Sequence, residues 1–350
     1  MKHLLFAASV IAAIAAPIAQ KSVKVLVLFD MEGVTAATDF KHTSYSHPTE
    51  YAVGRQSLTA DVNAAVAGLV AAGATDILIV DGHGSGNNSG PDVIEDQLRP
   101  PAKMHYRNTP FDIYMDSYDH SIDAIVAVAM HAGAGNRQGF LSHTLTFEDV
   151  DYKVNGVPFN ESMLLAMGAA RLKIPLIAIS GDDQLETEAR RQLPWVQYAT
   201  VKHAIDRTKA ESMPRDEASR RIESAAREGL ARIASARLPD YSGPYRFALT
   251  FQDETQARMA ALLPGAEQIG TTVQMRTNDF EDGYRKSRGM IGLAAAIART
   301  MASQSVLNAQ PNAATLRVDL TDWLYGRFLE TLPPVSQPAP TGPARYWGAP

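Results

Sequence analysis

The sequence of 350 residues contains no cysteine. This absence excludes disulfide bonds, a thiol nucleophile, zinc–thiolate sites and an amino-terminal cysteine for lipid attachment. Any metal site must therefore use histidine, aspartate and glutamate side chains. The fold must be stabilised by its hydrophobic core, by metal ions or by partners.

A strong excess of charge of either sign is also absent. The formal net charge is -5 at pH 7, and the sequence has no long acidic or basic run. Nucleic-acid-binding proteins usually present a strongly basic face, so we expect no nucleic-acid partner. Hydrophobic residues make up 45% of the chain, which is enough for one large domain or two smaller ones.

The first 20 residues have the pattern of a secretory signal peptide. Lys2 and His3 precede an apolar run over residues 4–16, and small residues suited to cleavage follow it. The run is too short for a stable membrane span, and we find no later segment that is long and apolar enough. We therefore expect a periplasmic or secreted protein with no membrane span after cleavage. A buried amino-terminal helix is the alternative.

Apolar, β-branched runs alternate with helical patterns over residues 21–200. Strands buried on both faces of a parallel sheet give such runs. A helix is predicted over residues 57–72, and the alternation implies right-handed crossovers. We therefore predict an α/β fold whose mostly parallel, doubly wound sheet occupies residues 21–200. The predicted strands are residues 23–29, 76–80, 123–130 and 174–180.

A hairpin is predicted between the third and fourth of these strands. Asn155 and Gly156 separate two strand-like segments, and Asn-Gly is the preferred pair for a type I′ turn. A helix is expected to follow from about Glu161 to Leu172, with Asn160 as its N-cap.

The pattern changes after residue 200. Charged helical and strand-like segments over residues 201–303 predict a smaller, carboxy-terminal α+β domain. Residues 304–350 form a Pro-rich and partly disordered extension by composition. Within this extension, residues 323–330 are interpreted as a short docking helix.

Three candidate metal ligands follow predicted strands. Asp30 ends the first strand, His83 follows the second, and His131 directly follows the third. Ligands in open parallel sheets bind beyond the carboxyl ends of the strands. The fold is therefore expected to bring these three side chains to the same edge of the sheet.

The sequence around these positions offers further ligands. Glu32 lies two residues after Asp30, so both carboxylates point to one side of an extended segment. Two crowded carboxylates repel each other unless a cation lies between them. An exposed acidic pair is the structural alternative for Asp30 and Glu32, and a flexible glycine-rich loop is the alternative for His83.

His131, His143 and Glu161 complete the set of candidates. A histidine after an apolar strand is often structural, and a carboxylate in the first turn of a helix complements the helix dipole. As a group, however, imidazoles and carboxylates suit zinc, and also manganese or cobalt. Five such ligands can hold two metal ions that share a water, which is the arrangement of a hydrolase site.

Several stretches resemble the D-stereospecific aminopeptidase family of binuclear zinc peptidases, whose type member belongs to a dipeptide-transport operon. The similarity is collinear from about Val23 to Ser303. The stretches are FDMEG (29–33), VDGHGSGNN (80–88), MHAG and FLSHT (130–144), NGVPFNE (155–161), SGDD (180–183) and GTTVQM (270–275).

The resemblance implies roles for the candidate residues. It makes His143 a catalytic residue beside the metals, which polarises the scissile carbonyl, stabilises the oxyanion or moves protons. It also implies an α/β domain with a smaller carboxy-terminal domain and a ring-like homo-oligomer. The implied metal ligands are Asp30, Glu32, His83, His131 and Glu161, with Asp30 bridging two zinc ions.

The functional hypothesis is a zinc-dependent aminopeptidase in which a metal-bridging hydroxide releases the amino-terminal residue of a short peptide or amide. The preference for a D-configured residue, such as D-Ala in wall peptides, comes from the resemblance alone. A metal-dependent amidase or phosphoesterase could use the same site, with Arg137 as the candidate basic group. A non-catalytic periplasmic metal- or solute-binding protein is the rival from another class.

Overall fold

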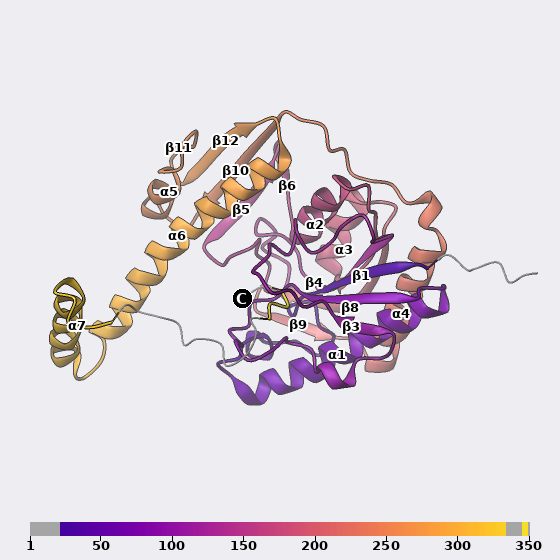
Figure 1. Cartoon of the computed structure of the whole chain (residues 1–350), viewed down its shortest axis with the longest axis horizontal. Helices are drawn as coiled ribbons and strands as arrows, with labels where there is room; N and C mark the ends of the chain where they lie inside the picture. Colours follow the sequence, from indigo (N-terminus) through magenta and orange to yellow (C-terminus); the bar gives the residue numbers. More distant parts are fainter. Residues whose placement is uncertain (1–21, 334–344, 349–350) are drawn as a thin grey trace, which may run out of the picture.

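The computed structural model describes residues 22–333 and 345–348. The predicted signal peptide at residues 1–20 and most of the Pro-rich stretch, residues 334–344, lie outside the described residues. The described chain forms a large, mostly parallel sheet covered by helices and a smaller antiparallel sheet beside it (Figure 1). This arrangement confirms the predicted fold class.

The large sheet has the strand order β3-β2-β1-β4-β7-β8-β9. Neighbouring strands pair in parallel except β9, which runs antiparallel to β8. The four predicted strands are present as β1, β2, β4 and β7, whereas β3, β8 and β9 were not predicted. The bounds are β1 Lys24–Phe29, β2 Asp76–Asp81, β3 Ala102–Met104, β4 Ala124–Met130, β7 Leu176–Asp182, β8 Gln197–Asp206 and β9 Lys209–Ser212.

Helices bury both faces of this sheet, as its apolar strands require. Val27 of β1 packs into a core with α1 and α4, whereas its neighbour Leu28 packs into a second core with α2. Helix α1 begins at Pro48, ahead of the predicted start at residue 57, because proline is well suited to the first helical turn. The helical bounds are η1 Phe40–Thr43, α1 Pro48–Ala71, η2 Glu95–Gln97, α2 Glu161–Ala170, α3 Asp183–Gln192, α4 Arg215–Ala231 and η3 Ile233–Ser235.

The smaller sheet has the order β11-β12-β10-β5-β6 and is antiparallel. The β5–β6 hairpin turns at Asn155 and Gly156, whose φ angles of 52° and 82° confirm the predicted type I′ turn. Helices α5 and α6 pack on this sheet. The bounds are β5 Asp149–Val154, β6 Val157–Pro158, β10 Tyr245–Phe251, α5 Glu254–Ala260, β11 Glu267–Ile269, β12 Thr272–Thr277 and α6 Phe280–Asn308.

The two sheets divide the chain differently from the boundary expected at residue 200. Strand β9 and helix α4 follow that residue but belong to the large sheet, whereas the β5–β6 hairpin precedes it and belongs to the small one. The hairpin joins the small sheet because β5 pairs with β10, for example Val154 with Phe247. Such a long-range pairing leaves no trace in local sequence patterns.

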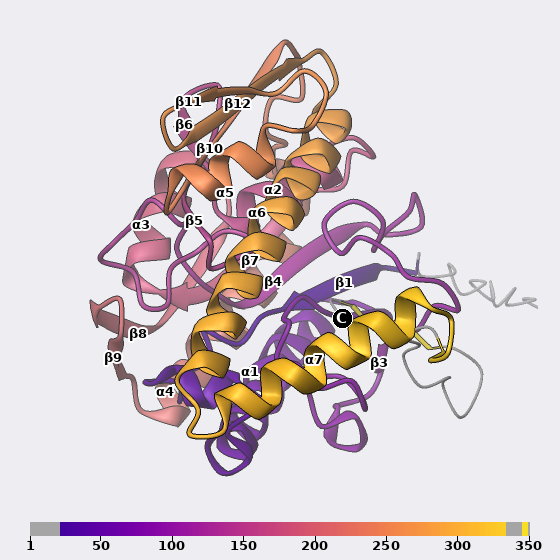
Figure 2. The ribbon, with the colours of Figure 1, turned by 90° about the vertical axis from the view of Figure 1, so that its left-hand side faces the viewer.

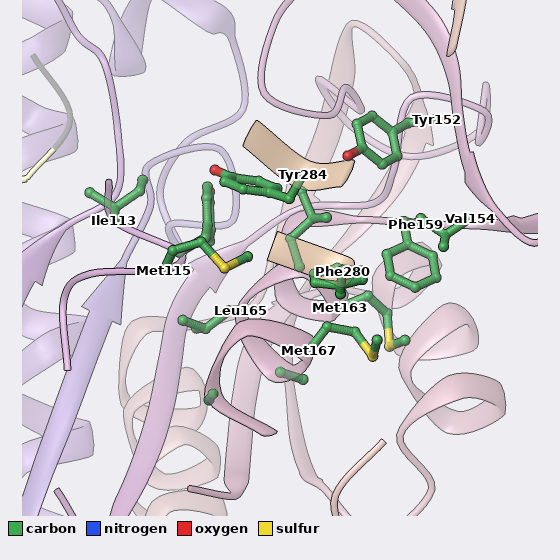
Figure 3. Packing of buried hydrophobic residues seen from close by; sticks show 14 of the residues in the cluster. Ile113, Met115, Tyr152, Val154, Phe159, Met163, Leu165, Met167, Phe280 and Tyr284 are labelled. Carbon is green, nitrogen blue, oxygen red and sulfur yellow. The ribbon is translucent and has the colours of Figure 1, made fainter. Parts of the chain in front are cut away.

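Aromatic and sulfur-containing side chains join the two sheets. Phe280, at the start of α6, lies 6.3 Å from Phe159 between ring centroids, next to Met163 of α2 (Figure 3). Tyr152 of β5 bonds through its hydroxyl to Ser287 of α6. Helix α2, which begins at Glu161, therefore packs against α6, the helix that covers the smaller sheet.

The carboxy-terminal helices extend away from this core. The buried residues of α6 lie between Phe280 and Ala295, and its remaining length projects outward (Figures 1 and 2). Helix α7, Ala313–Phe328, includes part of the predicted docking helix, but each of its residues is exposed or half-buried. Contrary to the expectation from sequence, α6 is long and apolar enough to cross a membrane, although its first half is packed on the small sheet.

We expect substitution of Gly68 by alanine to destabilise the fold. A Cβ at this position of α1 would lie 2.1 Å from the carbonyl oxygen of Glu223 in α4. Forcing the two helices apart costs about 1–3 kcal/mol, more than alanine gains by helix propensity. The free energy of unfolding, measured with urea, reports the change.

The matched control is Gly292→Ala in α6, where a Cβ would meet nothing within 4 Å. This variant should be as stable as the unaltered protein or more so. Equal stability of the two variants would contradict a close contact between α1 and α4.

Candidate metal centre

Three side chains meet at the carboxyl ends of neighbouring strands, as the sequence predicts. Asp30 follows β1, His83 follows β2 and His131 follows β4, and β1 lies between the other two strands. His131 Nε2 lies 3.2 Å from Asp30 Oδ2, and His83 Nε2 lies 3.4 Å from Glu32 Oε1. The structure therefore brings all four residues into one cluster.

Glu161 enters this cluster from the first turn of α2. Its helix begins where predicted, because the Asn160 side chain accepts a hydrogen bond from the Met163 amide. Glu161 Oε2 lies 3.6 Å from His131 Nε2, and Oε1 lies 3.9 Å from His143 Nε2. Its carboxylate is therefore placed between two imidazoles.

His143 stacks on His131, with 4.1 Å between ring centroids and 12° between ring planes. Two overlapping groups have ligand atoms within 4.8 Å of one another: Asp30, Glu32 and His131, and His131, His143 and Glu161. The geometry therefore permits His143 either to bind a metal ion or to stand beside one.

Backbone carbonyl groups orient two of the imidazoles. The Nδ1 atoms of His131 and His143 lie 3.0 Å and 2.8 Å from the carbonyl oxygens of Ala132 and Leu141. A carbonyl oxygen only accepts hydrogen bonds, so each Nδ1 carries the proton and donates it. Each Nε2 is left with a lone pair that faces the cluster, which is the tautomer a metal ligand requires.

The His83 loop is held by two aspartates. The Asp81 carboxylate accepts hydrogen bonds from the amides of His83 and Asp92, at 3.0 Å and 2.7 Å. Asp92 Oδ2 lies 2.8 Å from His83 Nδ1 and fixes its ring. Asp92 was not predicted as an orienting residue, because only the fold of the intervening loop brings it to His83.

Glu161 also has partners that sequence reasoning missed. Its Oε2 accepts a hydrogen bond from the hydroxyl of the buried Tyr114, and its Oε1 accepts one from the Leu145 amide at 2.7 Å. Tyr114 lies in an irregular segment before β4, so no periodic pattern points to it. These two bonds fix the plane of the carboxylate.

Local backbone irregularity aims His131. A register shift interrupts β4 between Ala127 and Met130, and Ala129 has a φ of 62° in the left-handed region. The Ala129 amide donates to Ser180 Oγ at 2.9 Å. Bulges of this kind redirect side chains next to active sites. A Cβ on Gly33 would lie 2.1 Å from the Met130 carbonyl oxygen, so only glycine lets the Asp30 loop approach β4.

A buried lysine holds the loop that carries Asp30 and Glu32. The Lys202 ammonium donates to the backbone carbonyl oxygens of Glu32 and Ala37 and lies 4.9 Å from the ring centroid of Phe140. Burial lowers the pKa of Lys202 to about 7. Strand β8, which supplies this lysine, was not predicted, so no local pattern pointed to Lys202.

Asp182, at the end of β7, has a structural role. Its carboxylate accepts hydrogen bonds from the amides of Leu185 and Phe140, at 2.8 Å and 3.0 Å. It is therefore the N-cap of α3 and anchors the segment before His143.

The electrostatics of the cluster call for added positive charge. Burial and the neighbouring Glu32 carboxylate raise the pKa of Asp30 to about 8. Burial disfavours the charged form of His83 and of His131, but the surrounding carboxylates outweigh it and raise both pKa values well above the usual range. A divalent cation would supply this charge without protonating the imidazoles.

Two buried atoms support this fit. Glu32 Oε2 and His131 Nε2 have no hydrogen-bond partner within residues 22–333 and 345–348. Buried polar atoms are rarely left without a partner. Oxygen and imidazole nitrogen donors without cysteine suit a borderline metal ion such as zinc, manganese or cobalt. The residues therefore fit a metal centre.

Comparison with known proteins identifies the family. A sequence model described as D-aminopeptidase matches residues 23–288, which is most of the chain. The chain belongs to the D-aminopeptidase family. This result confirms the resemblance seen in the sequence, and the family's members are peptidases.

Two relatives agree with this membership. The D-aminopeptidase of Bacillus subtilis (strain 168) is 27% identical over 276 residues, which cover 77% of this chain and 97% of the relative. The solved structure of the Zn-dependent D-aminopeptidase DppA from Bacillus subtilis, a self-compartmentalizing protease, aligns with a TM-score of 0.70 and 25% identity. That alignment covers 78% of this chain and 98% of DppA.

We expect Asp92→Asn to weaken metal binding by about 10–100-fold, because the amide no longer balances the charge or fixes the tautomer of His83. Competition with a chelating dye measures the affinity. Asp96→Asn is the matched control, since Asp96 lies in the nearby η2 turn and is exposed. Unchanged affinity in the Asp92 variant would show that this carboxylate does not support a metal ligand.

Proposed function

We propose that the chain is a zinc-dependent aminopeptidase that releases a D-configured amino-terminal residue, such as D-Ala, from short peptides or amides. The observation that carries the proposal is the convergence of buried carboxylates and oriented imidazoles at the ends of β1, β2 and β4. The Zn-dependent D-aminopeptidase DppA, which has a similar fold, supports zinc and the substrate class.

Five residues would hold two zinc ions per chain. When bound, the ions supply an acidified water as the nucleophile and polarise the scissile carbonyl. Manganese or cobalt is the alternative metal. The proposed ligands are Asp30, Glu32, His83, His131 and Glu161.

His143 is proposed as the catalytic residue beside the metals. Its Nδ1–H donates to the Leu141 carbonyl oxygen, so Nε2 carries the free lone pair. Nε2 can therefore accept a proton from the attacking water and, once protonated, donate to the developing oxyanion or the leaving amine. The stacked His131 ring and the Glu161 carboxylate keep the imidazole in place for both steps.

We further propose that the protein is exported and forms a homo-oligomer. The signal-peptide pattern over residues 1–20 supports export to the periplasm or the medium. The self-compartmentalizing DppA supports an assembly of several copies. Mass spectrometry of the protein from the periplasm and light scattering would test the two statements separately.

Metal content and hydrolysis test the main proposal together. We expect the metal-free protein to be inactive and about two equivalents of zinc to restore activity. With the metal restored, kcat/KM for D-alanyl p-nitroanilide should exceed that for the L-alanyl compound by at least about tenfold, or about 1.4 kcal/mol of transition-state binding.

Each rival has its own outcome in this experiment. Metal binding without turnover of any amide would favour a metal- or solute-binding protein. Hydrolysis of acylated amides or phosphoesters, without a need for a free amino group, would favour an amidase or phosphoesterase. The candidate basic residue for phosphoesters, Arg137, is exposed.

We expect His143→Ala to retain zinc and to lose about 10²–10⁴-fold in kcat, because the proton carrier is removed while the five ligands remain. Zinc content and kcat are measured on the same sample. His203→Ala is the control, since the His203 side chain is 57% exposed, contacts Asp183 and belongs to neither group of candidate ligands. Loss of zinc from the His143 variant would make His143 a ligand instead.

A further inference from the structure

The chain returns to the metal centre near its carboxyl end. The Trp347 carbonyl oxygen accepts a hydrogen bond from the Asp81 amide at 3.1 Å, and Tyr346 exchanges two backbone hydrogen bonds of 2.8 Å with Arg107. The segment Arg345–Gly348 therefore adds an extended strip of backbone to the end of β2, parallel at Asp81 and antiparallel at Arg107.

Side chains strengthen this attachment. Trp347 is half-buried and packs on the core beneath the large sheet, with its ring edge-on to Tyr106. The Arg345 guanidinium lies 3.8 Å from the centroid of the same tyrosine ring, which is a cation–π contact. Tyr106 is thus covered from two directions by the segment.

Gly348 makes the closest approach. A Cβ on this residue would lie 1.7 Å from the Asp81 carbonyl oxygen and 2.5 Å from the Asp81 carbonyl carbon. Both atoms belong to backbone, so neither can swing aside as the end of a flexible side chain could. Any other residue at this position would therefore push the segment off the strand.

Asp81, which holds the carboxy-terminal segment, also holds the His83 loop of the candidate metal centre. The Asp81 carboxylate accepts the amide hydrogen bonds of His83 and Asp92, while its backbone holds the carboxy-terminal segment. Figure 1 shows the short yellow segment at the carboxyl ends of the large sheet, on the side where the site lies. The attachment therefore borders the His83 side of the cluster.

This attachment lies outside the part of the chain that matches the family. The family match ends at residue 288, whereas 98% of DppA is covered by 78% of this chain. In the sequence, most of the projecting helix α6 and all of helix α7 lie between the end of the family match and this segment (Figure 2). It is held by backbone hydrogen bonds at an edge, a mode by which extended peptides also bind to sheets.

We propose that Arg345–Gly348 is a built-in competitor that occupies the peptide-binding rim next to His83 and must leave before a longer peptide can bind. The inference rests on the proposed function, because it requires that the backbone of a longer peptide substrate binds along this rim beyond its first residue. The Asp81 and Arg107 backbone groups and the Tyr106 ring are the surface that such a peptide would use. The proposal leaves a one-residue amide unaffected, because such a substrate has no backbone beyond its first residue.

Hydrogen exchange tests the attachment independently of activity. Exchange at the Asp81 and Arg107 amides should be at least about tenfold faster in Gly348→Ala, and in a chain ending at Ala344, than in the unaltered protein. Gly292→Ala, with open space around its Cβ, is the matched control and should leave exchange unchanged. Equal exchange in all four proteins would overturn the attachment.

Peptide binding tests the competition. In a His143→Ala background, which should keep zinc and turn over slowly, a fluorescent pentapeptide with amino-terminal D-Ala should bind about tenfold more tightly when Gly348→Ala is added, because the binding-competent fraction rises. Fluorescence anisotropy measures the affinity. The KM for D-alanyl p-nitroanilide should be the same for Gly348→Ala and for the unaltered protein, both of which keep His143. Equal peptide affinities with and without Gly348→Ala would overturn the competitor role.

The two proposals can fail separately in these measurements. Absence of turnover with every substrate would contradict the aminopeptidase function. Hydrogen exchange and peptide-binding affinity would still decide whether the segment blocks the rim. Turnover with unchanged peptide affinity in Gly348→Ala would leave the aminopeptidase intact and reject the competitor.

Discussion

Carboxylates enclosed together with imidazoles are the constraint on which the site and much of its surroundings depend. Asp30, Glu32 and Glu161 are all buried, and each shares a group of closely spaced ligand atoms with His131. Enclosed negative charges are unfavourable unless cations and hydrogen-bond donors compensate them. The Tyr114 hydroxyl, the Leu145 amide and the Lys202 ammonium supply part of this compensation, and divalent metal ions would supply the rest.

The same requirement explains why residues from distant parts of the chain serve one centre. Lys202 stands on β8 and holds the loop that follows β1, while Asp92 closes a loop onto His83. Each of these residues orients a candidate ligand or its loop and takes no part in the proposed reaction itself. Their loss should therefore act through the affinity for the metal and through the placement of the ligands.

The sequence predicted the centre better than its supports. Asp30, His83 and His131 were predictable because strand ends of a parallel sheet share one edge, a rule that needs only local patterns. Glu161 was marked by its N-cap and by the hairpin before it. Asp92, Tyr114 and Lys202 lie in an unpatterned loop, an irregular segment and an unpredicted strand, so only the folded chain brings them to the site.

The β5–β6 hairpin was predicted, but its pairing with β10 in the smaller sheet was not, since β10 follows almost a hundred residues later.

The position of that hairpin has a mechanical consequence. Strands β5 and β6 lie in the sequence between His143 and Glu161, yet they pair with β10 in the smaller sheet. A rigid-body movement of the smaller sheet would therefore displace Glu161, while the candidate ligands after β1, β2 and β4 would stay in place on the larger sheet. Metal ions bound by ligands from both sides would cross-link the two sheets. The metal-bound protein should therefore be more rigid across this junction than the metal-free protein.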